Sequence, residues 1–176
     1  MRSIILLLII IFSPSIYGQT NFTWDKVDSI SRNKNEIYSS TKMFISQTWN
    51  SAQDVIQNDD KDAGMILLKG LSSQSLYYQM NDHIWTFSYT VKFLMKDNKY
   101  RILIEDVYCK SARCQQYEWA LMPVSDVYPS EKGLKLTGVS EPKYLEIMTK
   151  LKQDLQSIID GYEKYLKTSK NTNADW

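Results

Sequence analysis

The chain has 176 residues, with 21 Lys or Arg against 20 Asp or Glu, and 43% of its residues are hydrophobic. This length and apolar content suit one domain with a sizeable core rather than two domains. The near-neutral charge argues against a nucleic-acid binder, because such proteins need excess cations to displace counterions from phosphates. It argues equally against a protein held on an anionic membrane surface.

The N-terminus has the order of a secretory signal peptide. Arg2 supplies a positive charge, residues 4–12 form an unbroken apolar run, and residues 13–18 (SPSIYG) contain a helix breaker and a small residue. That order of charged, apolar and cleavable regions is typical of export signals. A membrane span needs about 20 apolar residues, so the run is too short to be one. We expect cleavage near Gly18, which removes residues 1–18.

Cleavage would leave an exported domain. Residues 19–167 are expected to form a single domain, followed by a polar, flexible tail at 168–176. Loss of Arg2 leaves 20 basic and 20 acidic residues, a net charge of zero. No cysteine directly follows the apolar run, so a lipid anchor is not expected. The sequence therefore predicts a periplasmic or extracellular protein without stable membrane insertion.

The two cysteines, Cys109 and Cys114, lie five residues apart. In an oxidising compartment such a pair most simply forms a disulfide that closes a small loop, and free thiols are the alternative. A metal site would need two further soft ligands, and His83, the only histidine, is distant in the sequence. A thioredoxin-type pair needs two intervening residues, and here there are four.

An amphipathic helix is predicted over residues 35–51, where the apolar and aromatic side chains recur at helical spacing. Asn33 or Asn35 can cap this helix, and Glu36 suits the positive end of its dipole. The positions that carry the pattern are Ile37, Phe44, Ile45 and Trp49.

The middle of the chain predicts an antiparallel sheet. Residues 84–95 alternate strictly between apolar and polar side chains, which indicates a strand with one buried face. A turn at 96–99 joins this strand to its partner at 100–108. Residues 54–58 and 64–70 read as two shorter strands that precede this hairpin.

The last part of the chain predicts a second helix. Residues 117–122 would add another strand, and Pro142 then opens a long helix. A coiled coil would explain its apolar stripe, but the simpler interpretation is that this single helix lies across the sheet. The expected fold is α+β: a helix, four or five antiparallel strands, and a long C-terminal helix on one face of the sheet. The stripe comprises Tyr144, Met148, Leu151, Leu155, Ile158, Tyr162 and Tyr165.

Four segments carry a resemblance to a known family: NEIYSSTKMFISQTW, VIQNDD, AGMILLKG and KDNKYRILIED. They resemble a family of exported bacterial proteins of unknown function with a TATA-box-binding-protein-like (TBP-like) fold, over residues 35–106. The resemblance implies a curved antiparallel sheet that grips a long helix, and it implies no activity. DNA-binding members of that fold are internal duplicates with a basic saddle, whereas this chain has one copy and almost no net charge.

No catalytic constellation can be assembled from the sequence. His83 stands alone in a predicted solvated loop, and neither a Ser-His-Asp nor a Cys-His arrangement follows from it. The run Asp59, Asp60 and Asp62 lacks the glycine and glutamate of a calcium loop, so we expect a solvated turn. We therefore expect no enzyme, no metal and no cofactor.

A carboxylate pair for glycoside chemistry is a further possibility that the residues do not single out. Glu105, Asp106 and Glu118 could supply it, but no spacing rule distinguishes them from ordinary carboxylates at strand ends.

Aromatic residues are the one suggestive feature of the central strands. Trp85 and Tyr89 fit a core, whereas Tyr108, Tyr117 and Trp119 are candidate ligand contacts, because Tyr and Trp bury area while keeping a polar group. Two hypotheses follow. The first is a binding module for an envelope protein, glycan or small ligand, which would use the open sheet face or the groove beside the C-terminal helix. The second is a carrier with an apolar cavity between that helix and the sheet.

Overall fold

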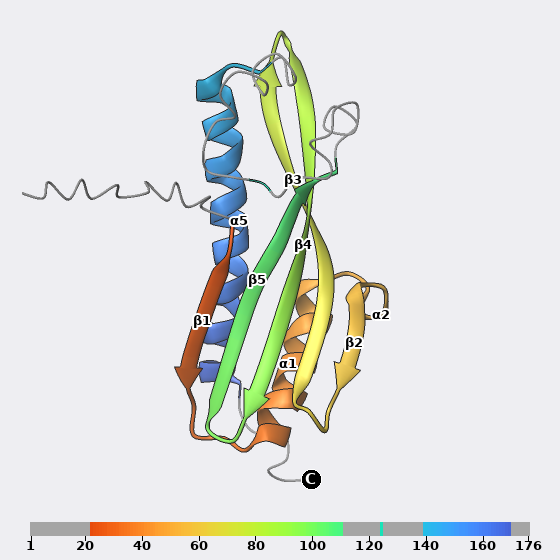
Figure 1. Ribbon diagram of the computed structural model, residues 1–176, viewed down its shortest axis with the longest axis vertical. Coiled ribbons are helices and arrows are strands. Elements are labelled where there is room, and N and C mark those ends of the chain that lie inside the picture. The colour runs from red at the N-terminus through yellow and green to blue at the C-terminus, as the bar shows by residue number, and fades with distance from the viewer. Residues whose placement is uncertain (1–21, 111–123, 125–138, 170–176) are drawn as a thin grey trace, which may run out of the picture.

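A computed structural model describes residues 22–110, 124 and 139–169 of the chain. Within them the antiparallel sheet and the long C-terminal helix confirm the predicted α+β fold (Figure 1). The elements are β1 (Trp24–Ser29), α1 (Lys34–Thr48), α2 (Ala52–Val55), β2 (Ile56–Asp60), β3 (Met65–Tyr78), β4 (Asn81–Lys96), β5 (Lys99–Cys109) and α5 (Glu141–Thr168).

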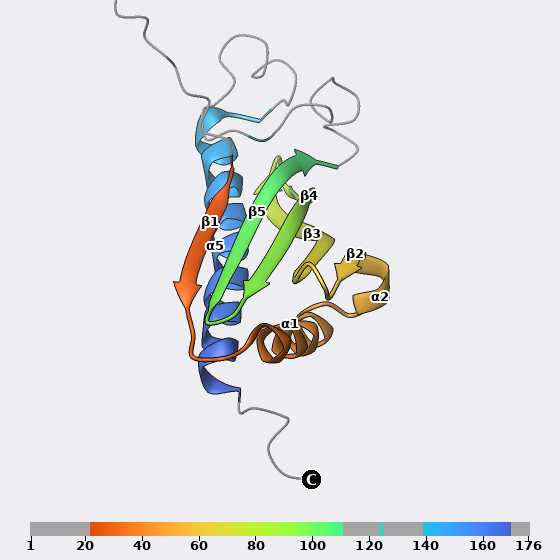
Figure 2. The ribbon, with the colours of Figure 1, turned by 60° about the horizontal axis from the view of Figure 1, so that its bottom comes forward.

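The five strands form one antiparallel sheet in the order β1-β5-β4-β3-β2. Strands β3 and β4 are the longest, and they pair with each other along the whole of β3. Strand β2 pairs with β3 only as far as Leu68, so the far half of the β3–β4 hairpin projects beyond its neighbours (Figure 1). Helices α1 and α5 lie on the same side of the sheet (Figures 1 and 2).

Strand β4 and its turn follow from the alternation in the sequence. The side chains of Trp85, Phe87 and Phe93 are no more than 2% exposed, whereas Thr86, Ser88 and Lys92 on the opposite face are less buried. Asn98 takes a left-handed backbone with φ of 60°, which asparagine tolerates better than most residues. This conformation closes the turn between β4 and β5, as the sequence predicts.

Helix α1 begins at a capping box. The Asn33 side chain accepts a hydrogen bond of 3.0 Å from the Glu36 backbone N–H, and the Glu36 carboxylate accepts one of 2.9 Å from the Asn33 N–H. Two N–H groups that have no partner within the helix are satisfied in this way. Of the two predicted caps, Asn33 is therefore the one used.

The core lies between the helices and the inner face of the sheet. Tyr162 of α5 packs edge-on against Phe93 and Tyr100, with ring centroids 4.8 and 5.3 Å apart. Its hydroxyl lies 2.8 Å from the Thr41 hydroxyl of α1, so the buried polar groups satisfy each other. Helix α5 thus completes the core by lying across the sheet, as predicted.

Two predicted strand boundaries are wrong. Residues 52–55 form one turn of helix, so the predicted strand at 54–58 begins only at Ile56. Asp59 lies in β2 instead of the predicted turn, where it accepts hydrogen bonds from Tyr38 and Lys42 of α1. These bonds hold β2 against the helix and move the turn to residues 61–64.

The predictions for His83 and for the first strand also need correction. His83 lies within β4 opposite Leu76 and is half-buried, because the hairpin turn falls at Gln79 and Met80 and the strand begins before the histidine. Strand β1 precedes α1 and pairs with β5, although its largely polar sequence gave no strand signal.

Candidate binding face

The two faces of the sheet differ in what covers them. The inner face carries the buried aromatic residues of β4 and is covered by α1 and α5. No helix of the described residues lies over the outer face, which Figure 1 shows in front. Within the described residues, the outer face is therefore the one accessible to a partner.

The half of the outer face nearest β1 is covered by matched charges. Arg101 donates two hydrogen bonds of 2.7 and 2.6 Å to the carboxylate of Asp25, and they hold the pKa of Asp25 below its ordinary value. Lys92 pairs with Glu105 on the neighbouring strand. Since these charges are satisfied within the chain, this half offers no strong attraction to a charged partner.

The projecting half of the hairpin is different, because the apolar side chains on its outer face are exposed. Leu71 is 66% exposed, Tyr77 63%, Ile84 68% and the tip residue Met80 88%. Hydroxyl side chains lie between them, and those of Ser73 and Thr86 are 3.3 Å apart across the strands. We call this surface the hairpin face; it comprises Leu71, Ser73, Ser75, Tyr77, Ile84, Thr86, Ser88 and Tyr108.

The inner side of the same hairpin is held by α5. Ser72 donates a 2.5 Å hydrogen bond to Asp154, and Lys150 donates one of 3.0 Å to the Ser75 carbonyl. At Gly70 the ring of Tyr89 lies so close that a Cβ would be 2.4 Å from its Cζ atom. The glycine therefore allows the ring to cover the strand, and the hairpin is presented on a fixed support.

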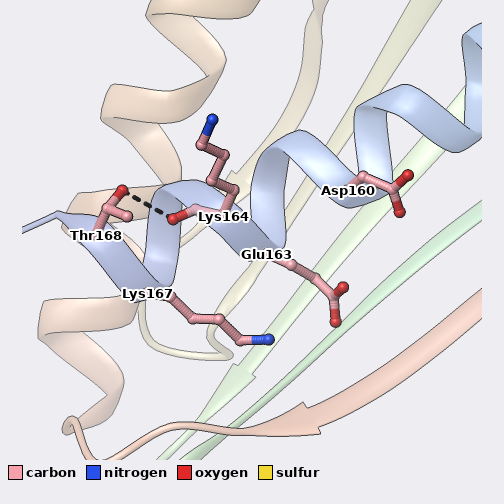
Figure 3. Close-up of a pocket in the computed structure, with 5 residues that line it drawn as sticks. All are labelled: Asp160, Glu163, Lys164, Lys167 and Thr168. Carbon is pink, nitrogen blue, oxygen red and sulfur yellow. Dashed lines mark hydrogen bonds between the residues drawn. The ribbon is translucent and has the colours of Figure 1, made fainter.

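A second feature is a hollow of about 410 Å³ beside the last turns of α5 (Figure 3). Its walls carry two acids and two lysines: Asp160, Glu163, Lys164 and Lys167, with Thr168. Strand β1 supplies counterions, since Lys26 pairs with Glu163 at 3.3 Å and Asp28 with Lys167 at 3.8 Å. The charges are balanced, so the hollow favours neither an anion nor a cation.

The buried Tyr100 hydroxyl lies behind this hollow, against Glu163 and Asp28. It makes no hydrogen bond of good geometry within the described structure. Its burial first, and then the two carboxylates, raise the pKa of Tyr100 well above its ordinary value. The hydroxyl therefore stays neutral and is unsuited to act as a base.

The structure places the predicted site residues unevenly. Tyr108 is half-buried on β5, opposite Ser88 at the rim of the hairpin face. Tyr117 and Trp119 lie outside the described residues, as does Glu118. Cys109 is buried in the sheet, but its predicted partner Cys114 is also outside them, so that disulfide stays a prediction. Trp85, Tyr89 and Tyr100 are buried in the core.

Sequence reasoning missed the exposed part of the hairpin face. Leu71, Tyr77 and Ile84 were not singled out, because an isolated apolar residue in a strand normally implies burial. The available signal was the stretch LSSQSLYY (residues 71–78), a β-compatible run without a charge.

The described residues contain no group of three or more His, Cys, Asp or Glu side chains that could hold a metal ion. Over the same ranges, no helix has both the length and the apolar character needed to cross a membrane.

Comparisons with solved structures agree on the fold. A DUF4468 family protein from Bacteroides ovatus ATCC 8483 superposes with a TM-score of 0.57 at 11% identity, over 87% of this chain and 90% of its own. A TBP-like protein from Parabacteroides distasonis ATCC 8503 superposes with a TM-score of 0.59 at 13% identity, over 85% of this chain and 95% of its own. At these identities the likeness concerns the fold alone.

Sequence comparison agrees with this result. No curated protein matches the chain. Residues 24–110 match a family described as "Domain of unknown function (DUF4468) with TBP-like fold", a span that contains the entire sheet and α1. Over residues 24–110, the chain therefore resembles the DUF4468 family in sequence, and it shares the TBP-like fold.

Proposed function

We propose that this protein is an exported, non-catalytic binding module of the bacterial cell envelope, and that the hairpin face contacts its partner. The observation that carries the proposal is the exposure of Leu71, Tyr77, Met80 and Ile84 on one projecting hairpin. Exposed apolar side chains that gather in one place, rather than scatter singly, mark interaction surfaces.

The chemistry of the hairpin face suits recognition rather than catalysis. Its tyrosines supply large, rigid contact area, and Ser73, Ser75 and Thr86 supply adaptable hydrogen bonds. Asp82 lies opposite Tyr77 beside the tip, and Lys69 lies two residues before Leu71 on the same side of β3. Such a surface fits a protein or a glycan of the envelope better than an ionic small molecule, because it offers area and hydroxyl groups but few charges.

Export is part of the proposal. The charged, apolar and cleavable order of residues 2–18 supports delivery to the periplasm or the extracellular space. The cysteine pair at 109 and 114 fits an oxidising compartment of that kind.

The alternative is a carrier with an apolar cavity between α5 and the sheet, and the described residues give no observation in its favour. The rings of Phe44, Phe93, Tyr100 and Tyr162 pack together there, with centroids 4.8 to 6.3 Å apart. The hollow beside α5 is charged and lies at the surface. An apolar ligand would gain little from either place.

Photo-crosslinking in the native host cell tests the proposal. A photoreactive amino acid at Ile84, on the hairpin face, is compared with one at Met43, which is 44% exposed on α1. We expect a discrete adduct from position 84 and none from position 43. Protease or glycosidase digestion of the adduct then distinguishes a protein from a glycan. Equal adducts at both positions, or none at position 84, would refute the assignment of the face.

A further inference from the structure

Strand β3 has an edge that no strand of the described residues covers. Strand β2 pairs with β3 from Met65 to Leu68, and β4 occupies the other side along the full length. Within the described residues, 69–78 therefore have one edge that no strand pairs with, although Lys150 of α5 reaches it at the Ser75 carbonyl. Such an edge is a template on which another strand can pair.

The hydrogen bonds show which backbone groups point to this edge. The Lys110 N–H donates 2.7 Å to the Thr86 carbonyl, so the backbone of Thr86 faces β5. Ser73 lies opposite Thr86. Because paired residues of an antiparallel sheet alternate between hydrogen-bonded and non-hydrogen-bonded pairs, the backbone N–H and C=O of Ser73 point away from β4. By the same alternation, the backbone groups of Leu71, Ser75 and Tyr77 point to this edge. Lys150 donates its hydrogen bond to the Ser75 carbonyl from that side.

The exposed edges of this sheet are not equally protected. Strand β1 carries Asp25, Lys26 and Asp28, and β2 carries Asp59 and Asp60, all of which discourage pairing with another chain. Residues 70–78 (GLSSQSLYY) contain neither a charge nor a proline. Among the described residues, the edge without such charges is therefore also the one with which no strand pairs.

We propose that a second copy of this chain pairs with this edge, with β3 antiparallel to β3 about a two-fold axis at Gln74. This register places Leu71 opposite Tyr77 of the partner subunit, and Ser73 opposite its Ser75, each pair occurring twice. Two exposed apolar residues would meet on the outer face, where cross-strand aromatic pairs stabilise a sheet. The pattern is thus complementary to itself.

The charges of α5 support the same register independently. Lys150 contacts Ser75 and Asp154 contacts Ser72, so the level of Gln74 lies between the two charged residues. A two-fold axis at that level sets Lys150 opposite Asp154 of the partner subunit, twice. Lys150 would exchange the Ser75 carbonyl for this carboxylate, which frees the backbone for the partner strand.

A cysteine at the axis tests the register. Residue 74 would face its own copy in a non-hydrogen-bonded pair, with Cα atoms about 4.5 Å apart. This separation lies within the range of disulfides. We expect Gln74→Cys to form a covalent dimer on mild oxidation of the exported protein. The matched control Ser75→Cys should not, because its own copy lies about 7–8 Å away on the diagonal.

A charge exchange tests the same contact without cysteines. The variant S73K/S75K sets lysine against lysine, and S73E/S75E sets glutamate against glutamate. We expect each alone to raise the Kd of the dimer at least about tenfold, a change of about 1.4 kcal/mol. An equimolar mixture should restore a dimer, seen as a doubled mass by light scattering. Circular dichroism and unfolding curves check that both variants fold.

A wild-type protein that stays monomeric would overturn the proposal, and so would a dimer that the charge variants leave unchanged. Equal crosslinking of Gln74→Cys and Ser75→Cys would overturn the register. This inference goes beyond the proposed function and fails separately from it. Ile84 on β4 is not part of the edge, so its adduct in cells reports the envelope partner whether or not the chain dimerises.

Discussion

The same two strands, β3 and β4, pass through two different environments. We call the half that contains Phe93 and Leu68 the lower half, as in Figure 1. There α1 and α5 cover the inner side of the two strands, and Phe93 and Leu68 are fully buried. In the projecting half only the inner side is held, and Leu71 and Ile84 on the other side are about two-thirds exposed. The strand geometry is continuous, so the difference arises from what the neighbouring elements cover.

This difference separates stability from recognition within one hairpin. Apolar area that becomes buried on folding stabilises the domain, whereas apolar area that stays exposed contributes little to the free energy of unfolding. The exposed residues of the hairpin face are therefore free to serve contact with other molecules. If the comparison is right, substitutions in the two halves should have unequal effects on stability.

The largest expected effect comes from the lower half. Phe93→Ala removes a fully buried ring that packs against Phe44 and Tyr162, so the free energy of unfolding should fall by about 3–5 kcal/mol. The matched change Ile84→Ala in the projecting half should shift it by no more than about 0.5 kcal/mol. Urea unfolding followed by tryptophan fluorescence measures both. Comparable losses would show that the hairpin face is part of the core.

Much of this comparison follows from the sequence, but unevenly. The buried half of β4 was predicted because its alternation reflects one covered face and one solvated face. The far half of β3 was missed, since Ser72, Ser73 and Ser75 give no apolar period. Strand β1 was missed for a similar reason, because three of its six residues are charged. Its place in the fold depends on backbone pairing with β5, which side-chain patterns do not reveal.

The candidate site was harder to predict than the fold. Tyr108 was predicted from its residue type, and it lies at the rim of the hairpin face. The exposure of Leu71, Tyr77 and Ile84 depends on their place on the uncovered outer face and on how far β3 and β4 extend beyond β2. No local pattern encodes that extent, because it is set by where the neighbouring elements end.

The boundary between the two halves lies at Gly70, and a methyl group there should be costly. Gly70→Ala would drive its Cβ into the buried ring of Tyr89, and overpacking of this kind costs about 1–3 kcal/mol. Gly161→Ala is the matched control: its Cβ would meet Phe44 at an ordinary 3.7 Å, in a helix. It should stabilise the protein by about 0.5–1 kcal/mol. Opposite signs in thermal unfolding support the argument, and equal signs contradict it.

A substitution at Asn33, the N-cap of α1, tests how much this cap contributes to the stability of the lower half. Asn33→Ala removes the side-chain oxygen that accepts from Glu36, which should lower the free energy of unfolding by about 1 kcal/mol. Asn33→Asp keeps an acceptor oxygen and should retain most of the stability. Helix α5 is the internal comparison, because Ser140 makes no side-chain cap bond and Ser140→Ala should have little effect. Equal losses at both helices would contradict the role of the capping box.

The smallest expected effect appears only at alkaline pH, at the contact between α1 and β2. Partial burial, and then the hydrogen bond to Asp59, raise the pKa of Tyr38 from 10.0 to about 12. Because the folded state holds this proton more tightly, its contribution to stability is complete below pH 10 and is lost as the pH rises through 12. Tyr38→Phe has no such proton. The difference in unfolding free energy between wild type and Tyr38→Phe should therefore shrink over that interval, and a constant difference would place the hydroxyl in water.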